Sequence, residues 1–312
     1  MRYLLIVYLL LVPVSLWADC RGLAPARGVP APAEDEWNLA TLNLWRLRDI
    51  RKDSHLDKPL SSAVLERRLE ALADFIAGPL RAPHMLAVQE VENRQLLAAL
   101  VERLARYGWR YRVVLKEGND PSGMDVGLLY RQPVQIASAE SLFTEQDFHG
   151  HALFSRPPLH VTVQAPRQLQ LVVVHLRSAR GLQKAQVQEK RQSQAALLAN
   201  WVTKQDGPLI VAGDFNSTWD AGRLSASYAR FAESGLFNLW QLMPEPERYS
   251  FRYRCQPQAL DHIWVSREAK KAVSRTAVTR GNAGRYHSLY GSQGVTPVSD
   301  HDAVVVYFTG GR

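Results

Sequence analysis

The sequence predicts an α/β fold in which two sheets of mostly antiparallel strands pack together and helices flank their outer faces. Apolar runs of strand length recur along the chain, and many are separated only by short turns, which favours antiparallel pairing. Three segments with helical spacing lie between these runs. The 312 residues are 46% hydrophobic, which is enough apolar material for a large core. This order fits a two-sheet sandwich better than a doubly wound parallel sheet.

Strands are predicted where a short apolar run is bounded by turn residues. In chain order they cover residues 37–43, 85–89, 111–115, 126–130, 134–137, 159–164, 169–174, 209–212, 260–265 and 303–308. Helices are predicted between them. Residues 62–77 carry apolar side chains at helical spacing, a second helix follows the capping residue Asn93 and ends at Gly108, and residues 183–203 form a long amphipathic third. The chain therefore reads as one layered domain behind an N-terminal extension.

The first 18 residues have the pattern of a secretory signal. Arg2 gives a positive start, residues 4–12 are apolar, and Ala18 offers a cleavage position. The apolar run is shorter than the ~20 residues that a membrane span needs. We therefore expect a secreted or periplasmic protein with no stable membrane span after cleavage of residues 1–18, although an uncleaved anchor is an alternative. Residues 19–36 are rich in Ala, Pro and Gly and predict an extended leader without a core.

Cysteine content and charge bear on the compartment and the substrate. Cys20 and Cys255 are the two cysteines of the sequence, and in an exported protein such a pair predicts a disulfide, with two free thiols as the alternative. The formal net charge is +8 and the pI is about 9.6. That charge favours attraction to a polyanion such as nucleic acid or to an anionic membrane surface, although solubility alone would also account for it.

Polar side chains stand at the ends of six predicted strands. They are Asn43, Glu90, His175, Asp214 with Asn216, Asp261, and Asp300 with His301. Carboxylate and amide oxygens bind hard cations, and a histidine can take a proton from water when a carboxylate orients its ring. Each residue alone would more often be a turn, cap or core residue. All six segments together, each attached to an apolar strand, predict metal-assisted phosphoester chemistry.

These segments resemble the motifs of the endonuclease/exonuclease/phosphatase superfamily, the DNase I-like metal-dependent phosphoesterases. The matching motifs are Thr41-Leu-Asn43, Val88-Gln-Glu90, Val174-His-Leu-Arg-Ser178, Gly213-Asp-Phe-Asn-Ser217, Leu260-Asp-His-Ile263 and Ser299-Asp-His301. The resemblance covers residues 37–308, so residues 37–312 are assigned as the catalytic domain. It implies a four-layered α/β sandwich and a divalent metal, usually Mg²⁺, with Mn²⁺ or Ca²⁺ also compatible.

The resemblance also implies roles for residues near the metal. Asn43 and Glu90 resemble the metal-binding pair, and Asp300 resembles a further carboxylate of the metal site. Asp214 and Asn216 resemble the pair that orients the water or leaving group and contacts the phosphate. We therefore expect all five side chains to converge at one end of the two sheets.

Two histidines complete the implied site. His301 resembles the base, with Asp261 as its orienting partner, and His175 resembles the histidine that donates to the phosphate. Which histidine is base and which is acid stays open at this stage. The abasic-site repair branch carries Tyr-x-Pro-Asn where this chain has Val174-His-Leu-Arg-Ser178, so the chain looks most like bacterial secreted or periplasmic nuclease-like members.

Basic residues near these motifs are candidates for substrate binding. Arg177 follows His175, and Lys184, Lys190 and Arg191 continue into the third helix, where a phosphate-facing side and a solvated helix face are both compatible with the pattern. Arg252 and Arg254 alternate with aromatic residues in residues 249–254, which predicts a strand with the arginines on one face. The alternative there is a strand whose aromatic face packs into the core.

We therefore expect an exported Mg²⁺-dependent phosphodiesterase, a nuclease that hydrolyses DNA, with RNA left open, and has little sequence preference. The alternatives are a phospholipid (sphingomyelinase-like) or small-molecule phosphoesterase on the same fold, and a binding protein that has kept the fold without catalysis. No protein partner is predicted. The sequence leaves open whether cleavage is internal or from an end, which product end forms, and the oligomeric state.

Overall fold

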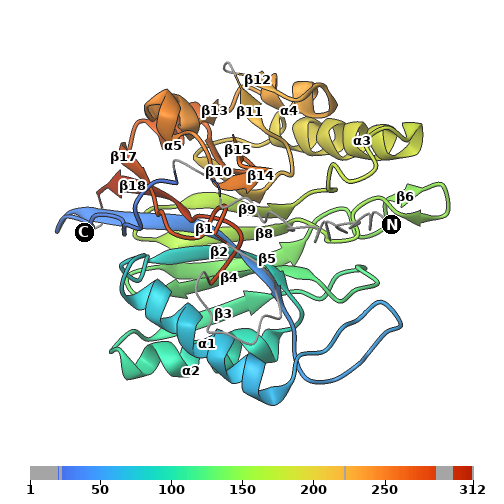
Figure 1. The fold of residues 1–312 in the computed structure, drawn as a ribbon. Helices are drawn as coiled ribbons and strands as arrows, with labels where there is room; N and C mark the ends of the chain where they lie inside the picture. Colours follow the sequence, from blue (N-terminus) through green and yellow to red (C-terminus); the bar gives the residue numbers. More distant parts are fainter. Residues whose placement is uncertain (1–19, 21–22, 221–222, 286–297, 311–312) are drawn as a thin grey trace, which may run out of the picture.

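The computed structural model describes residues 20, 23–220, 223–285 and 298–310 (Figure 1). Two six-stranded sheets pack face to face, and helices cover their outer faces. Helices α1 (Ser62–Ala77) and α2 (Arg94–Arg106) lie at the bottom of Figure 1, and α3 (Ala185–Val202) lies at the top. The predicted α/β sandwich is confirmed. The signal predicted over residues 1–18 lies outside the described residues.

The first sheet has the strand order β17-β18-β1-β2-β4-β3. Its strands are β17 (Val273–Val278), β18 (Val304–Thr309), β1 (Glu36–Leu47), β2 (Met85–Val91), β4 (Asp125–Arg131) and β3 (Tyr111–Leu115). Only β1 and β2 pair in parallel within this sheet, and the other neighbours are antiparallel. One parallel pair therefore lies at the centre of a mostly antiparallel sheet.

The second sheet has the order β13-β16-β10-β9-β8-β5 and repeats this design. Its strands are β13 (Phe237–Asn238), β16 (Asp261–Val265), β10 (Leu209–Asp214), β9 (Leu169–His175), β8 (Leu159–Ala165) and β5 (Gln135–Ser141). Here β9 and β10 are the parallel pair. The expectation of two mostly antiparallel sheets therefore holds for both.

Short elements fill the connections between these strands, most of them between strands of the second sheet. They are the pairs β6 (Asp147–Phe148) with β7 (His151–Ala152), β11 (Trp219–Asp220) with β12 (Arg223–Leu224), and β14 (Phe251–Tyr253) with β15 (Gln256–Gln258), the helices α4 (Ala229–Ala232) and α5 (Arg267–Lys270), and the 3-10 turns Ala226–Tyr228, Leu239–Leu242 and Glu245–Glu247. Apart from β14, the sequence does not single out these elements, because each is too short to carry a periodic apolar pattern.

Alternate residues of the central strands face two different cores. In β1, Leu39 packs between the two sheets, whereas Ala40 and Leu42 pack on the side of α1 and α2. In β2, Ala87 and Val88 divide in the same way. Since both faces of these strands are buried, their residues are mostly apolar on both faces, with buried polar residues such as Thr41 and Asn43 among them.

The two long helices of the first half begin and end as their sequence predicts. The Oγ of Ser61 accepts from the backbone of Val64, and Gly78 follows the last residue of α1. Oδ1 of Asn93 accepts from the backbone of Leu96 at 3.0 Å, so Asn93 caps α2 as expected. α3 lies within the predicted span of residues 183–203. Among the described residues, no helix is long and apolar enough to span a membrane.

Several strands differ from the expectation: β13 has two residues and is not predicted, and β5 extends to Ser141. The sequence does not predict β17, because its polar residues Ser274 and Arg275 interrupt the apolar pattern of what is an edge strand. β14 ends at Tyr253, since Arg254 and Cys255 have φ angles of +46° and +66° and form the turn to β15. The strand predicted over residues 249–254 is therefore too long, and Arg254 does not share a strand face with Arg252.

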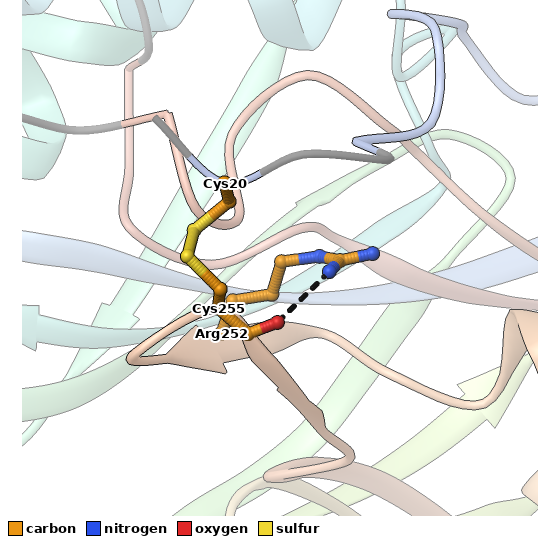
Figure 2. Close-up of a disulfide and its surroundings, with 3 residues drawn as sticks. All are labelled: Cys20, Arg252 and Cys255. Carbon is orange, nitrogen blue, oxygen red and sulfur yellow. Dashed lines mark hydrogen bonds between the residues drawn. A yellow bond between two sulfur atoms is a disulfide. The ribbon is translucent and has the colours of Figure 1, made fainter. Parts of the chain in front are cut away.

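The described part of the leader is extended, as predicted, but it contacts the core, which the sequence does not predict. Val29 is 4% exposed, and its backbone N–H donates to the carbonyl of Pro79 at 2.9 Å. Cys20 forms the predicted disulfide with Cys255 (Figure 2). Figure 2 also shows Arg252 donating to the carbonyl of Cys255 at 3.1 Å. The disulfide thus ties the start of the described chain to the β14–β15 hairpin.

Candidate active site

Sheet topology brings the polar strand ends together. The parallel pairs β1–β2 and β9–β10 each place two carboxyl ends at one edge of a sheet. β10 sets Asp214 beside His175 of β9, and the antiparallel strand β16 sets Asp261 beside the same aspartate. Ser299, just before β18, donates from Oγ to the carbonyl of Asn43 at 2.7 Å. The last motif of the chain therefore adjoins the end of β1.

Asn43 joins the two sheets at this point. Its Nδ2 lies 3.1 Å from Oε1 of Glu90 and 3.2 Å from Oδ2 of Asp214. Its Oδ1 accepts from the backbone N–H of Trp45 at 2.8 Å, and the residue is 1% exposed. Three strands thus contribute one side chain each to a compact group of Asn43, Glu90 and Asp214, which we call the acidic floor.

The backbone of Glu90 is strained where it enters the acidic floor. Its φ angle is +58°, in the left-handed region that favours glycine, and the pairing of β2 with β4 shifts register between Gln89 and Val91. Such a conformation costs a non-glycine residue about 1 kcal/mol or more and persists where the surroundings enforce it. The irregularity interrupts the strand alternation at Glu90, whose carboxylate lies against the amide of Asn43.

His175 lies over the acidic floor as a neutral imidazole. Its Nε2 is 3.6 Å from Oδ2 of Asp214 and 3.8 Å from Oε1 of Glu90, and the residue is 5% exposed. Burial, together with the positive charges of Arg156 and His301, holds the pKa of His175 well below its usual value. An uncharged ring with a hydrogen on Nε2 is suited to donate a hydrogen bond to an incoming anion.

His301 has the opposite electrostatic setting. Its Nδ1 donates to Oδ2 of Asp261 at 2.6 Å, and the ring packs against Phe251 with centroids 4.9 Å apart. Burial lowers the pKa of His301, but the negative charge of Asp261 and the neighbouring carboxylates outweighs it and holds that pKa well above its usual value. Asp261 is fully buried, and its hydrogen bond to Nδ1 fixes the orientation of the His301 ring. This leaves Nε2 as the nitrogen that can exchange a proton with a substrate.

Asp214 and Asn216 link the ends of β9 and β10. Burial and the repulsion of Asp261 raise the pKa of Asp214 to about 7. The backbone N–H of Asn216, which has a φ angle of +50°, donates to Oδ1 of Asp214 at 2.7 Å. Its Nδ2 donates to the carbonyl of Leu176 at 3.0 Å. Asn216 therefore holds both strand ends as well as standing in the site.

Asp300 stands on the other side of His301. Its Oδ1 lies 3.9 Å from Nε2 of His301, and burial raises the pKa of Asp300 to about 6. The side chain is 19% exposed, yet Oδ1 is buried and has no hydrogen-bond partner among the described residues. A buried carboxylate oxygen without a donor is costly in a site of this kind, and a cation would satisfy it.

The donor set of the site fits a hard divalent cation. Two groups of three ligand atoms lie within 4.8 Å of one another, namely Glu90 with His175 and Asp214, and Asp214 with Asp261 and His301. Of the predicted metal ligands, Asn43 and Glu90 come together as expected, while Asp214 completes their group and Asp300 belongs to neither group of three. Several carboxylates confined in so small a volume repel one another, and a divalent cation would balance them.

The three arginines predicted to bind substrate differ in their exposure to solvent. Arg177 is half-buried, and its Nη1 donates to the carbonyl of Ser178 at 3.1 Å. Arg252 is half-buried, with its guanidinium 4.6 Å from the centroid of the Tyr249 ring. Arg254 is exposed in the turn between β14 and β15. Their contact with substrate stays a prediction.

Two buried arginines that support the site escape the strand-end pattern. Arg68 of α1 is 1% exposed and donates to the carbonyls of Leu44, Trp45 and Arg46, directly after Asn43. Arg191 of α3 is also 1% exposed, so neither of the two alternatives left open for it, a phosphate-facing side or a solvated helix face, describes this residue. The sequence carries one sign that both arginines are buried. Each has an apolar residue four positions before it and another four positions after it, so it lies on an apolar face of its helix.

Comparison with solved structures identifies the same fold. The D. rerio TDP2 structure in complex with a single-strand DNA product is 19% identical, with a TM-score of 0.60 over 88% of this chain and 100% of that chain. A humanized D. rerio TDP2 with 14 mutations is 18% identical, with a TM-score of 0.60 over 88% of this chain and 99% of that chain. The human Nocturnin catalytic domain with bound sulfate is 19% identical, with a TM-score of 0.56 over 89% and 96%.

Comparison of sequences gives the family. No curated protein matches the chain. The Endonuclease/Exonuclease/phosphatase family matches residues 37–301, which span every strand end of the site from β1 to His301. The chain therefore belongs to the Endonuclease/Exonuclease/phosphatase family.

Proposed function

We propose that this protein is an exported, Mg²⁺-dependent phosphodiesterase that hydrolyses nucleic acid with little sequence preference. The observation that carries the proposal is the position of Asp214, which contacts the acidic floor on one side and has the Asp261–His301 pair on the other. Cation ligands and a carboxylate-oriented histidine are the two components that metal-assisted hydrolysis requires. Both occur here within one buried group.

Asn43, Glu90 and Asp300 would hold the cation, with Asp214 adjoining them. The fit rests on the carboxylates of the acidic floor and on the buried oxygen of Asp300 that lacks a donor among the described residues. When bound, a divalent cation would polarise the phosphoryl oxygen and balance the negative charge of the site.

The remaining residues would handle protons and orientation. With a divalent cation balancing the carboxylates that raise its pKa, His301 would be free to take the proton of the attacking water at Nε2, while Asp261 holds Nδ1 and stabilises the imidazolium that results. His175, neutral and buried, would donate from Nε2 to a phosphoryl oxygen, where negative charge grows during attack. Asp214 and Asn216 would orient the water. This assignment makes His301 the base and His175 the hydrogen-bond donor.

Charge supports nucleic acid as the substrate. The formal net charge of the sequence is +8, and a basic surface attracts a phosphate backbone without reading its bases. Arg177 follows His175 by two residues along the chain, and Arg254 is exposed on a hairpin whose Phe251 packs on His301. Among proteins of similar fold, TDP2 has been solved with a single-strand DNA product. We assign the arginines to the backbone phosphates beside the scissile bond.

Export is supported by the disulfide and by the predicted signal. A bond between Cys20 and Cys255 persists in an oxidising compartment such as the periplasm or the cell exterior. Residues 1–18 have the composition of a cleaved secretory signal. Measurement of the mature N-terminus by mass spectrometry tests this part of the proposal, since export through such a signal predicts a chain that starts near residue 19.

A second candidate is hydrolysis of a phospholipid headgroup at the same site. Ile50 and Leu56, in the loop after β1, are 53% and 48% exposed, and Leu182, in the loop after β9, is 38% exposed. Both loops follow strands that contribute residues to the site, and exposed apolar side chains on such loops would suit a lipid surface. The nucleic acid candidate is preferred because of the basic charge of the chain.

The two candidates are separated by the same preparation on different substrates. Purified residues 19–312 would be incubated with single- and double-stranded DNA, with RNA and with phosphatidylcholine or sphingomyelin vesicles, each with Mg²⁺ and with EDTA. We expect metal-dependent cleavage of nucleic acid that is lost in Asp214→Asn. Release of phosphocholine without cleavage of nucleic acid would move the assignment to the second candidate, and nucleic acid cleavage that persists in Asp214→Asn would refute this site.

A further inference from the structure

Arg191 is a buried cation whose donors serve the backbone of the site. It lies on α3 and is 1% exposed. Its Nη1 donates to the carbonyl of Arg177, and its Nη2 donates to the carbonyl of Asn216 at 2.9 Å. No carboxylate lies within 4.0 Å of its guanidinium among the described residues, and its charged group instead lies 4.7 Å from the centroid of the Tyr228 ring. An arginine buried without an acid partner needs a reason other than an ion pair.

The two acceptors stand at equivalent places in the site. Arg177 follows His175 by two residues, and Asn216 follows Asp214 by two residues. His175 and Asp214 are register partners in the parallel pair β9–β10 and are the last residues of their strands. Beyond them the backbone N–H of Leu176 donates to the carbonyl of Asp214 at 2.9 Å, and Nδ2 of Asn216 donates to the carbonyl of Leu176 at 3.0 Å. Contacts made from outside the sheet therefore add to two direct bonds between the strand exits.

Gln194, one helical turn further along α3, also holds the backbone of Arg177. Its Oε1 accepts from the backbone N–H of Arg177 at 2.9 Å, and its Nε2 donates to the carbonyl of Leu153 at 2.9 Å. Gln194 is 3% exposed. Arg177 therefore has both its N–H and its carbonyl held by α3. The helix thus fixes the exit of β9 directly and joins it to the exit of β10 through one guanidinium.

We infer that Arg191 is a positioning residue that sets the separation of His175 from Asp214 and Asn216 by clamping the two strand exits behind them. The inference rests on the proposed hydrolase function, in which these residues contact the water and the phosphate. The planar fork of a guanidinium donates to two carbonyls at once, whereas a lysine ammonium acts as a point charge. Arg191 does not contact substrate, because its donors point to backbone carbonyls inside the protein.

Arg191→Lys on the full mature chain tests the inference, since it keeps the charge and removes the fork. We expect kcat for plasmid DNA and for bis(p-nitrophenyl) phosphate to fall by roughly 10- to 100-fold, because small displacements of reacting groups have effects of that size. KM and its dependence on salt should stay close to the wild type. Arg103→Lys is the matched control, because Arg103 is 8% exposed and donates to the carbonyl of Ala99 on α2, away from the site.

Hydrogen exchange gives a readout that does not depend on turnover. We expect Arg191→Lys to speed exchange in peptides that cover residues 176–178 and 215–217, and Arg103→Lys to leave these peptides unchanged. Unchanged exchange in both segments would overturn the inference even in a preparation without activity. Full kcat in Arg191→Lys, or a loss confined to KM with a weaker salt dependence, would overturn it too. An inactive wild type with the expected exchange pattern would instead contradict the proposed hydrolase.

Discussion

His301 Nδ1 lies 2.6 Å from Oδ2 of Asp261, and this bond sets which nitrogen of the ring faces the acidic floor. Asp261 belongs to β16 of the second sheet, whereas His301 precedes β18 of the first. The pair therefore forms only when the two sheets are packed together. Asp214, the register partner of Asp261 on β10, accepts from Nδ2 of Asn43 in the first sheet. A second hydrogen bond therefore crosses between the sheets at the same end of the sandwich.

Asp261→Asn should leave the fold intact and reduce turnover. An amide carries no negative charge to stabilise the imidazolium that forms when His301 accepts a proton. Its NH₂ group can also donate to Nδ1, which would move the ring hydrogen to Nε2. We expect kcat for bis(p-nitrophenyl) phosphate to fall by about 10²- to 10⁴-fold. Asp206→Asn, at an exposed carboxylate before β10, is the control. A kcat within experimental error of the wild type would remove Asp261 from the proposed mechanism.

Glu90→Gln should weaken binding of the cation. The change removes one negative charge from the acidic floor while it keeps the size of the side chain. We expect the dissociation constant for Mn²⁺, read from the resonance signal of the free ion, to rise roughly tenfold or more. Glu66→Gln is the control, since the Glu66 side chain is 66% exposed and lies on α1 beside Arg103. Equal Mn²⁺ affinity in both variants would exclude Glu90 as a ligand.

His262 should make the protein less stable in mild acid. Its Nδ1 accepts from Nδ2 of Asn238 at 2.9 Å and its Nε2 donates to the carbonyl of Ser217 at 2.8 Å, so the folded protein holds the ring neutral. Burial lowers the pKa of His262 to about 4, below the unfolded value of 6.5. Because the unfolded chain binds this proton more readily, the free energy of unfolding falls as pH drops from the unfolded pKa towards the folded one. The loss is up to about 3 kcal/mol.

Urea unfolding at about pH 7.5 and about pH 4.5 measures this loss. Burial also lowers the pKa of His84 to about 4, so part of the slope should remain in His262→Gln. We expect the variant to be less stable than the wild type at the higher pH and to lose less stability on acidification. The same loss in both proteins would mean that His262 does not titrate as described.

The disulfide should contribute to stability mainly by constraining the unfolded chain. Cys20 and Cys255 are 235 residues apart in sequence, and closing so long a loop is worth up to about 5 kcal/mol in the chain-entropy model. The double variant Cys20→Ala/Cys255→Ala should unfold at a lower urea concentration than the oxidised wild type. Dithiothreitol should shift the wild type in the same direction and leave the variant unchanged. A wild type insensitive to reduction would contradict this account.

Much of the site could be predicted because its residues stand where apolar runs stop. Asn43, Glu90 and His175 each follow buried strand residues, and a strand end needs no such side chain to fold. The strained backbone of Glu90 could not be predicted, since no glycine or turn residue marks it. The sequence also does not state which carboxylate joins the acidic floor. Asp300 and Asp214 are both predicted to lie near the metal, and the register of β10 against β9 brings Asp214 into contact with Asn43.

The supporting residues were harder to predict because their roles depend on packing between distant elements. Arg191 lies among Lys and Gln residues on α3, a composition typical of a solvated helix face, and the loops after β9 and β10 bury it. For Arg68, as for Arg191, the only sign in the sequence is the apolar residue four positions away on either side. β17 carries polar residues because it is an edge strand, and its pairing with β18 alone defines it as a strand.

Cleavage of supercoiled plasmid by purified residues 19–312 tests the central claim most directly. The reaction would be run with Mg²⁺ and with EDTA, beside His301→Ala, with melting temperatures compared to confirm that the variant is folded. We predict nicking by the wild type that requires Mg²⁺ and is lost in His301→Ala. Plasmid that stays intact with the wild type at every Mg²⁺ concentration, or nicking that persists in the folded variant, would contradict the assignment of this site as a metal-dependent nuclease centre.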